Sequence, residues 1–247
     1  EPRFRTIGSE KWSDEEGFAD DVAALGVTGI CGSAIIEVIA EMYLAGVISE
    51  DGVIDGALAE RTPRILQNGR TWSYLLHDGT PRITVTQNDV RAIQLAKAAL
   101  YAGIRLLMEK QGIDHVDTIR LAGAFGTFID PKYAMVLGLI PDCDLAKVKA
   151  VGNAAGHGAL MALLSRDHRR EIEQAVTHIE KIETALEPNF QKLFIAAMAL
   201  PNKVDPFPFL EREVTLPPRQ KDEQGTSGDG APRRRSREDR AARRGRA

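Results

Sequence analysis

The hydrophobic positions of the chain follow two spacings, one typical of helices and one typical of short strands. Apolar residues recur every three or four positions in two long stretches, which predicts helices over 34–45 and about 87–110. Short apolar runs bounded by turn residues predict strands. The strands are expected at 3–7, 64–66, 71–76, 82–85, 119–122 and 147–151. Further helices are expected at 131–137, from the glycine turn after 151 to about 164, from Asp167 onward and from 188 to 201, with an edge strand at 178–184 as an alternative.

Capping residues support several of these helices. Ser33 is the expected N-cap of the first helix, which Gly46 ends. Thr86 and Asp89 form a capping-box pattern ahead of the long helix. Asp130 followed by a proline is the expected start of the 131–137 helix.

The apolar stripe of the long helix contains one charged position. Val90, Ile93, Leu100, Ile104 and Leu107 keep helical spacing only if position 97, a lysine, belongs to the stripe. A buried ammonium must be paired, reach the surface or meet an anion. We expect Lys97 to pair with Glu37 or Glu41, with an anion as the alternative.

Two strand–glycine turn–helix units follow each other in the second half of the chain, which indicates an α/β layer structure. Ligands of open α/β sheets collect at the carboxyl ends of strands, and glycine lets backbone N–H groups approach them. Gly123 and Gly126 are therefore candidate ligand contacts, with a tight turn as the alternative. Gly152 and Asn153 either face the same ligand or serve close helix–sheet packing. Gly32 and Ser33 begin a helix and could bind an anion, although a simple cap is commoner.

Composition and charge narrow the class of protein. Residues 233–247 carry eight arginines against two acids, whereas the rest of the chain is acidic. A nucleic-acid-binding domain is therefore not expected, although the tail alone could contact nucleic acid or an acidic partner. No apolar run is long enough to cross a membrane.

The two cysteines indicate neither a metal motif nor a disulfide framework, so a cytoplasmic protein without a metal site is expected. Cys31 precedes a helix, where a thiol pKa can fall, but a buried and inert thiol is the commoner case. No pattern of nucleophile and base is recognisable either, which leaves the catalytic residues unknown.

Several segments together resemble one protein family. They are Gly29-Ile-Cys-Gly-Ser-Ala-Ile-Ile-Glu37, Thr86 to Lys97, Leu121-Ala-Gly-Ala-Phe-Gly126, Val151-Gly-Asn-Ala-Ala155 and Phe190 to Pro201. In order and spacing they resemble the C-terminal ATPase domain of reductive activators of corrinoid-dependent enzymes. That domain is a member of the actin, sugar-kinase and heat-shock-chaperone (ASKHA) superfamily.

The resemblance implies a fold and a division of the chain. The fold would be an α/β actin-like, ribonuclease H-like subdomain with a mixed sheet and flanking helices. Residues 1–200 would form the C-terminal part of the ATPase domain. An extended surface segment is expected over 201–215, and a disordered Arg-rich tail over 216–247.

The resemblance also implies an activity. Such activators use ATP or ADP with Mg²⁺ to drive one electron uphill from a 2Fe–2S cluster to cob(II)amide on a corrinoid protein of a methyltransferase system. The product is cob(I)amide. A homodimer is a further candidate assembly. The cluster's four cysteines are absent here and would belong to an upstream ferredoxin domain. The two phosphate-binding hairpins of the superfamily would also lie upstream of Glu1. The chain is therefore expected to be an N-terminally truncated fragment, inactive alone.

What remains would be the adenosine side of a nucleotide cleft. The implied contacts are Gly123, Ala124, Phe125, Gly126, Gly152, Asn153, Gly32 and Ser33. Ala124 departs from the family, which often has a third glycine there, and it narrows the room for ribose or adenine. Two alternatives stay open: a nucleotide-regulated module that binds a protein partner through the 87–110 helix, and a small-molecule kinase of the same superfamily.

Overall fold

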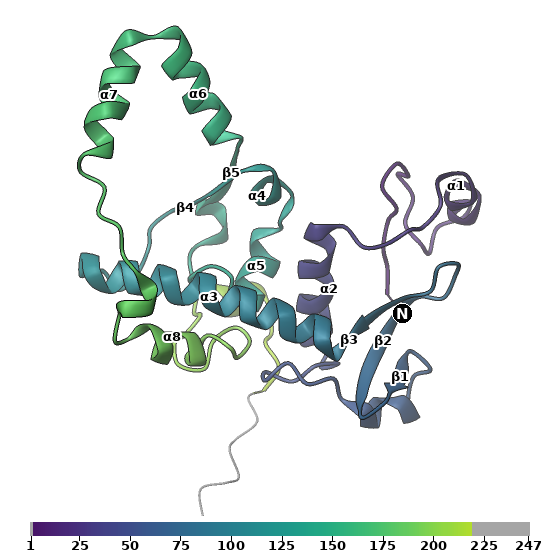
Figure 1. The fold of residues 1–247 in the computed structure, drawn as a ribbon. Coiled ribbons are helices and arrows are strands. Elements are labelled where there is room, and N and C mark those ends of the chain that lie inside the picture. The colour runs from purple at the N-terminus through teal and green to yellow at the C-terminus, as the bar shows by residue number, and fades with distance from the viewer. Residues whose placement is uncertain (1, 219–247) are drawn as a thin grey trace, which may run out of the picture. The chain divides into compact units, whose positions relative to one another are not determined.

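The strands form two small sheets. The computed structural model describes residues 2–218 of the protein. β1 (Ile65–Asn68), β2 (Thr71–His77) and β3 (Ile83–Thr86) form an antiparallel sheet in that order. β4 (Ile119–Ala122) and β5 (Val148–Gly152) pair in parallel (Figure 1). The expected α/β fold with flanking helices is confirmed, with parallel and antiparallel strands in separate sheets.

Two helices precede the antiparallel sheet, and the other helices lie around and after β4 and β5. Their bounds are α1 (Phe18–Leu25), α2 (Gly32–Leu44), α3 (Gln87–Gln111), α4 (Ala124–Phe128), α5 (Pro131–Leu137), α6 (Ala154–Leu164), α7 (Arg166–Val176), α8 (Phe190–Ala196) and α9 (Leu210–Glu213). Short 3₁₀ turns lie at Gly56–Glu60, Leu145–Lys147 and Thr184–Leu186. None of the helices in the described part of the chain has the length and apolar character that a membrane crossing needs.

Helix α3 is the longest element, and its predicted limits are confirmed. The Thr86 hydroxyl accepts from the Asp89 N–H at 3.2 Å, and the Asp89 carboxylate accepts from the Thr86 N–H at 2.8 Å, which completes the capping box. Gly112 ends the helix with a φ of 66°, a conformation that glycine adopts without strain.

The predicted stripe on α3 is wrong in part. Leu100 and Leu107 are half exposed. The buried face is rotated from the predicted one, and its members are Val90, Gln94, Lys97, Ala98, Tyr101, Ala102, Leu106 and Met108. Several polar side chains face inward because partners far along the sequence satisfy them.

The N-terminal segment differs from its prediction. Residues 3–7 form no strand, and Arg3 instead stacks on Trp12 and pairs with Asp14 at 2.8 Å. Helix α1 was not predicted. Phe18 is its one buried residue, and the ring of Phe18 meets Phe4 edge to ring at 5.7 Å. A helix held by a single apolar anchor leaves no periodic pattern to detect.

Two predicted caps also need correction. Cys31, not Ser33, is the N-cap of α2, and it makes no capping hydrogen bond through its side chain. Helix α7 is capped by Ser165, which accepts from the His168 N–H at 3.3 Å, while Asp167 lies within the first turn. The alternative edge strand at 178–184 is absent from the structure.

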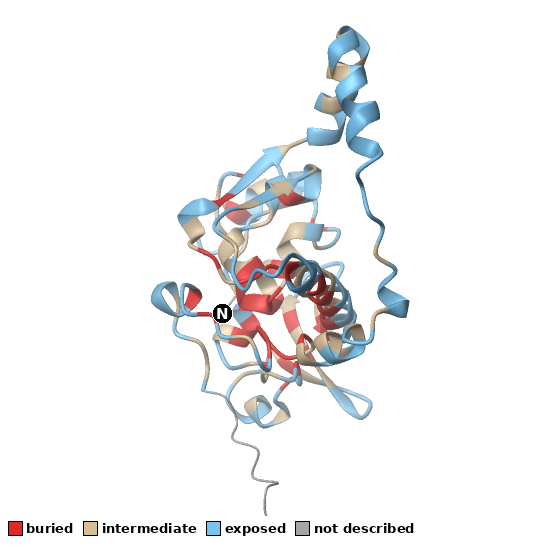
Figure 2. Ribbon diagram, turned by 90° about the vertical axis from the view of Figure 1, so that its left-hand side faces the viewer, coloured by how far each residue is buried: buried red, intermediate tan, exposed pale blue. Residues whose placement is uncertain are grey.

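The core is built mainly by α2, α3, α5 and the segment around α9 (Figure 2). We predicted an extended surface segment over 201–215. This prediction is wrong, because part of the segment is buried and part is helical. Phe207 and Leu210 are buried at 1% and 0% exposure, and the segment contains α9. Asp142 anchors it by accepting from the N–H groups of Phe209 and Leu210. The Arg-rich tail lies outside the described residues from 219 onward, and the domain limits remain predictions.

The burial of Phe207 gives a testable contrast with its neighbour. Phe207 stacks on Tyr101 with ring centroids 6.2 Å apart, whereas Phe209 is 41% exposed. We expect Phe207→Ala to lower the free energy of unfolding by about 3–5 kcal/mol, because it leaves a core cavity. The matched Phe209→Ala should cost about 1 kcal/mol or less. Urea unfolding of both variants measures the two costs, and equal losses would show that Phe207 does not anchor the segment.

Candidate functional site

Parallel pairing of β4 with β5 brings the two predicted glycine turns together. The register runs from Ile119 opposite Val148 to Ala122 opposite Gly152. Immediately after the strands, the Gly123 N–H donates to the Gly152 carbonyl at 2.7 Å. The two turns, separated in sequence by α4 and α5, are therefore in direct contact at the carboxyl ends of neighbouring strands. This is the position at which open α/β sheets collect ligands.

The first turn is shorter than predicted, since α4 begins directly after Gly123. The φ of Gly123 is 95°, which L side chains rarely adopt, so this position requires glycine. Gly126 is buried within α4, where a Cβ would lie 3.1 Å from the Leu121 carbonyl carbon. Close helix–strand packing thus accounts for Gly126. Ala124 and Phe125 are exposed residues in the first turn of α4, with Phe125 at 55%.

The start of α2 joins the same place. A Cβ built on Gly32 would lie 3.2 Å from the Phe125 ring, so the two residues are neighbours. Ser33 follows within the first turn of α2. The structure therefore brings together the three predicted segments, although they are distant in sequence.

The second turn leads into α6. The Asn153 side chain caps this helix by accepting from the Gly156 N–H at 2.9 Å. Gly156 packs against Asn153, and a Cβ there would collide with its amide. Asn153 therefore has a structural role, and its contact with a ligand stays a prediction. Helices α6 and α7 bury no residue in the described structure (Figure 2).

Cys31 lies at the edge of this site and is exposed, contrary to the expectation of a buried thiol. Its Sγ atom lies 3.4 Å from the Ser33 hydroxyl oxygen. Hydrogen bonding to Ser33 and to the backbone N–H groups of Ala34 and Ser33 holds the pKa of the Cys31 thiol below its ordinary value. The start of α2 thus favours a negative charge, as helix N-termini do.

An acidic group lies further along α2. Burial and the nearby Asp130 carboxylate raise the pKa of Glu37. Tyr133 of α5 donates to Glu41, and burial together with that hydrogen bond raises the pKa of Tyr133. The positive charge of Lys132 opposes these effects and lowers the pKa of Glu37.

Lys97 does not join that group, which corrects our expectation of a pair with Glu37 or Glu41. It is fully buried and donates to the carbonyl of Ala199 and, at 2.9 Å, to that of Pro201. Both acceptors belong to the chain after α8, so no anion is needed to satisfy Lys97. It plays no part in the candidate site.

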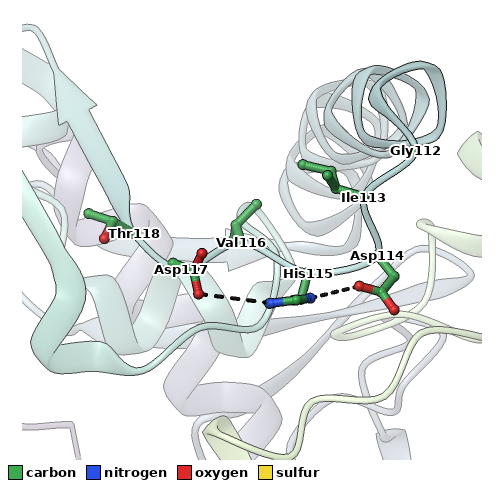
Figure 3. A pocket seen from close by; sticks show the side chains of 7 residues that line it. All are labelled: Gly112, Ile113, Asp114, His115, Val116, Asp117 and Thr118. Carbon is green, nitrogen blue, oxygen red and sulfur yellow. Dashed lines mark hydrogen bonds and ion pairs between the residues drawn. The ribbon is translucent and has the colours of Figure 1, made fainter.

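A surface hollow lies elsewhere, at the connection between α3 and β4. It is lined by Gly112 to Thr118, and Figure 3 shows His115 between two carboxylates. His115 Nδ1 lies 2.7 Å from Asp114, and Nε2 lies 3.9 Å from Asp117. The Asp114 hydrogen bond raises the pKa of His115. Sequence reasoning missed this cluster, although the spacing of Asp114, His115 and Asp117 could have drawn attention to it.

A second cavity of about 360 Å³ adjoins this hollow, between Tyr101, Arg105 and Phe209. Neither hollow includes the residues of the candidate site. Within residues 2–218, no group of three or more His, Cys, Asp or Glu side chains has the geometry to hold a metal ion.

Comparison with known proteins assigns the family. The family model described as the C-terminal domain of RACo, the ASKHA domain, matches residues 1–211. The corrinoid activation enzyme RamQ from Eubacterium limosum is 36% identical over 182 residues, which are 68% of this chain and 30% of RamQ.

A solved structure of a reductive activator for corrinoid, iron-sulfur protein shares 31% identity with a TM-score of 0.63, over 70% of this chain and 28% of that one. The chain therefore spans less than a third of these relatives. Because the family model covers most of the residues and the fold agrees, the chain belongs to the family of C-terminal ASKHA domains of RACo, the reductive activator of corrinoid proteins.

Proposed function

We propose that this chain supplies the adenosine-binding side of an ATP-dependent reductive activator. The activator returns cob(II)amide of a corrinoid methyltransferase system to cob(I)amide. Its family, and its similarity to a corrinoid activation enzyme and to a reductive activator for corrinoid, iron-sulfur protein, support this proposal. In the full activator, an iron–sulfur cluster held outside this chain would supply the one electron that Co(II) takes up, and ATP would drive this uphill transfer.

The convergence of three segments carries the proposal. Gly123 bonds to Gly152, and Gly32 contacts Phe125, so two glycine turns and a helix start share one surface. Exposed Ala124 and Phe125 offer a small and an aromatic side chain, on which a nucleoside can pack. The backbone N–H groups of glycine turns suit polar atoms of the same ligand.

The residues of this chain fit a nucleoside but not the other groups of the reaction. A 2Fe–2S cluster of the ferredoxin type needs four thiolates, and this chain has only Cys31 and Cys143. In the described residues, no group of three or more His, Cys, Asp or Glu side chains could hold a metal ion by itself. In the proposal, Mg²⁺, the phosphates and the cluster are therefore held by other parts of a longer activator. The corrinoid protein is the partner that receives the electron.

A binding module without electron transfer is the second candidate, and one observation favours it. Helix α3 exposes Leu95, Leu100 and Leu107 at 47%, 50% and 52%. Apolar side chains on one long helix can form a protein interface. In this alternative, nucleotide binding would control a partner on α3 while no electron moves.

Nucleotide binding can be tested at Ala124. We expect Ala124→Leu to raise the Kd for ADP about tenfold, roughly 1.4 kcal/mol, because the larger side chain occupies the ligand surface. Isothermal titration of ADP into the full-length protein measures the change. Ala96→Leu is the matched control, since Ala96 is exposed on α3 away from the site. Equal ADP affinities in the wild type and both variants would remove the β4–α4 turn from the nucleotide site.

A further inference from the structure

Helix α3 holds the chain after α8 through a row of polar side chains. Gln94 donates to the Met198 carbonyl at 3.0 Å, and one turn later Lys97 donates to Ala199 and Pro201. The next turns of α3 hold the end of this segment through Asp205. We call Met198–Asp205 the strap. Its contacts with α3 recur at every helical turn.

The last two contacts of the row converge on one carboxylate. The Tyr101 hydroxyl donates to Asp205 at 2.9 Å, and Arg105 Nε lies 3.3 Å from the same oxygen, Oδ2. Arg105 Nε is buried without hydrogen-bond geometry to any partner, so this contact is an ion pair only. Burial, followed by the charge of Asp205, raises the pKa of Tyr101. Tyr101 therefore stays neutral and does not titrate near neutral pH.

Lys97 is the unusual member of the row. Its exposure is 0%, and no carboxylate of the described residues pairs with it. The two carbonyls that accept from it match the two hydrogens of a neutral amine. An ammonium would bring a third hydrogen and a buried charge without a counter-ion. The geometry therefore favours the neutral form when the strap is closed.

Several charged residues lie on the segments that pack around Lys97. They are Arg105 and Asp205 further along the row, Glu50 and Asp51 in the turn that contacts the strap, and Lys203 within the strap. The Glu50 carbonyl accepts from the Leu200 N–H, and the Asp51 carbonyl accepts from Gln94. Glu50 therefore contacts the strap, and Asp51 contacts Gln94, through backbone carbonyl oxygens rather than through carboxylates.

We propose that the strap is a pH-sensitive latch, which closes on Lys97 as a neutral amine and opens as that amine takes up a proton. Opening would also free the end of α5, because a Cβ on Gly138 would collide with the Pro201 carbonyl that lies against it. The other end of α5 begins two residues after α4, so the latch connects with the candidate site. The latch itself does not depend on the proposed function.

The direction of the pH effect follows from the two states of Lys97. Burial lowers the pKa of Lys97 to about 7 in the closed state, whereas an exposed lysine has a pKa of about 10.4. The open state therefore binds more protons between these two values. Opening becomes about tenfold easier for each unit by which the pH falls in this window. Below pH about 7 both states are protonated, and the dependence ends.

Amide hydrogen exchange can follow opening directly. The Leu200 N–H donates to Glu50 and the Lys203 N–H donates to Ala196, so both report on the closed strap. After correction for intrinsic rates, we expect their protection to rise about fiftyfold from pH 7 to pH 9 in the full-length protein. Amides within α2, such as that of Ile39, should show no such rise. A pH-independent strap, or an equal rise in α2 that signals global unfolding, would overturn the latch.

A pair of variants assigns the effect to Lys97. Lys97→Met keeps the length and apolar stem of the side chain but cannot titrate, so the pH dependence of strap protection should disappear. Lys110→Met is the matched control, because Lys110 lies on the same helix and pairs at the surface with Glu187. It should keep the full dependence. Persistence of the dependence in Lys97→Met would refute the proposal. If that variant does not fold, the wild-type comparison of strap and α2 still decides.

Discussion

The parallel pairing of β4 with β5 is the constraint on which the candidate site depends. A parallel pair aligns the carboxyl ends of both strands, so the turns that follow must leave the sheet at the same edge. The hydrogen bond from Gly123 to Gly152 fixes the turns in contact. The start of α2 reaches the same edge only because α2 packs on α5 and places Gly32 beside Phe125. Nothing local in sequence joins these three segments.

Helix α3 supplies the second constraint, through its contacts with the strap. Its inward face is polar at Gln94, Lys97 and Tyr101, and each of these side chains donates to the strap or to the turn at Asp51. A buried polar row specifies one arrangement, since any shift would leave donors without acceptors. The strap in turn carries Phe207 and Leu210 into the core. Residues 198–210 are therefore an integral part of the domain.

The sequence predicted elements well where the signals are local. The capping box at Thr86 and the Asp130 cap define α3 and α5, and short apolar runs define β4 and β5. The sequence-based predictions were wrong where a side chain packs against residues that are distant in sequence. The acceptors of Lys97 lie beyond α8, so helical periodicity suggested a carboxylate instead. The prolines around Phe207 suggested a surface segment, so the burial of Phe207 in the core was not predicted. The residues of the candidate site came from family motifs, but the contacts among them were not predictable. They arise from the parallel pairing of β4 with β5 and from the packing of Gly32 beside Phe125.

Protection of Cys31 by nucleotide tests whether the three segments form one nucleotide-binding surface. Cys31 is exposed at the start of α2, whereas Cys143 is buried and serves as an internal reference. If the three segments form such a surface, ADP should slow the alkylation of Cys31 in the full-length protein in a saturable manner. Adenosine should slow the same reaction more weakly. The rate at Cys143 should not change. Alkylation of Cys31 at the same rate with and without saturating ADP would contradict the account.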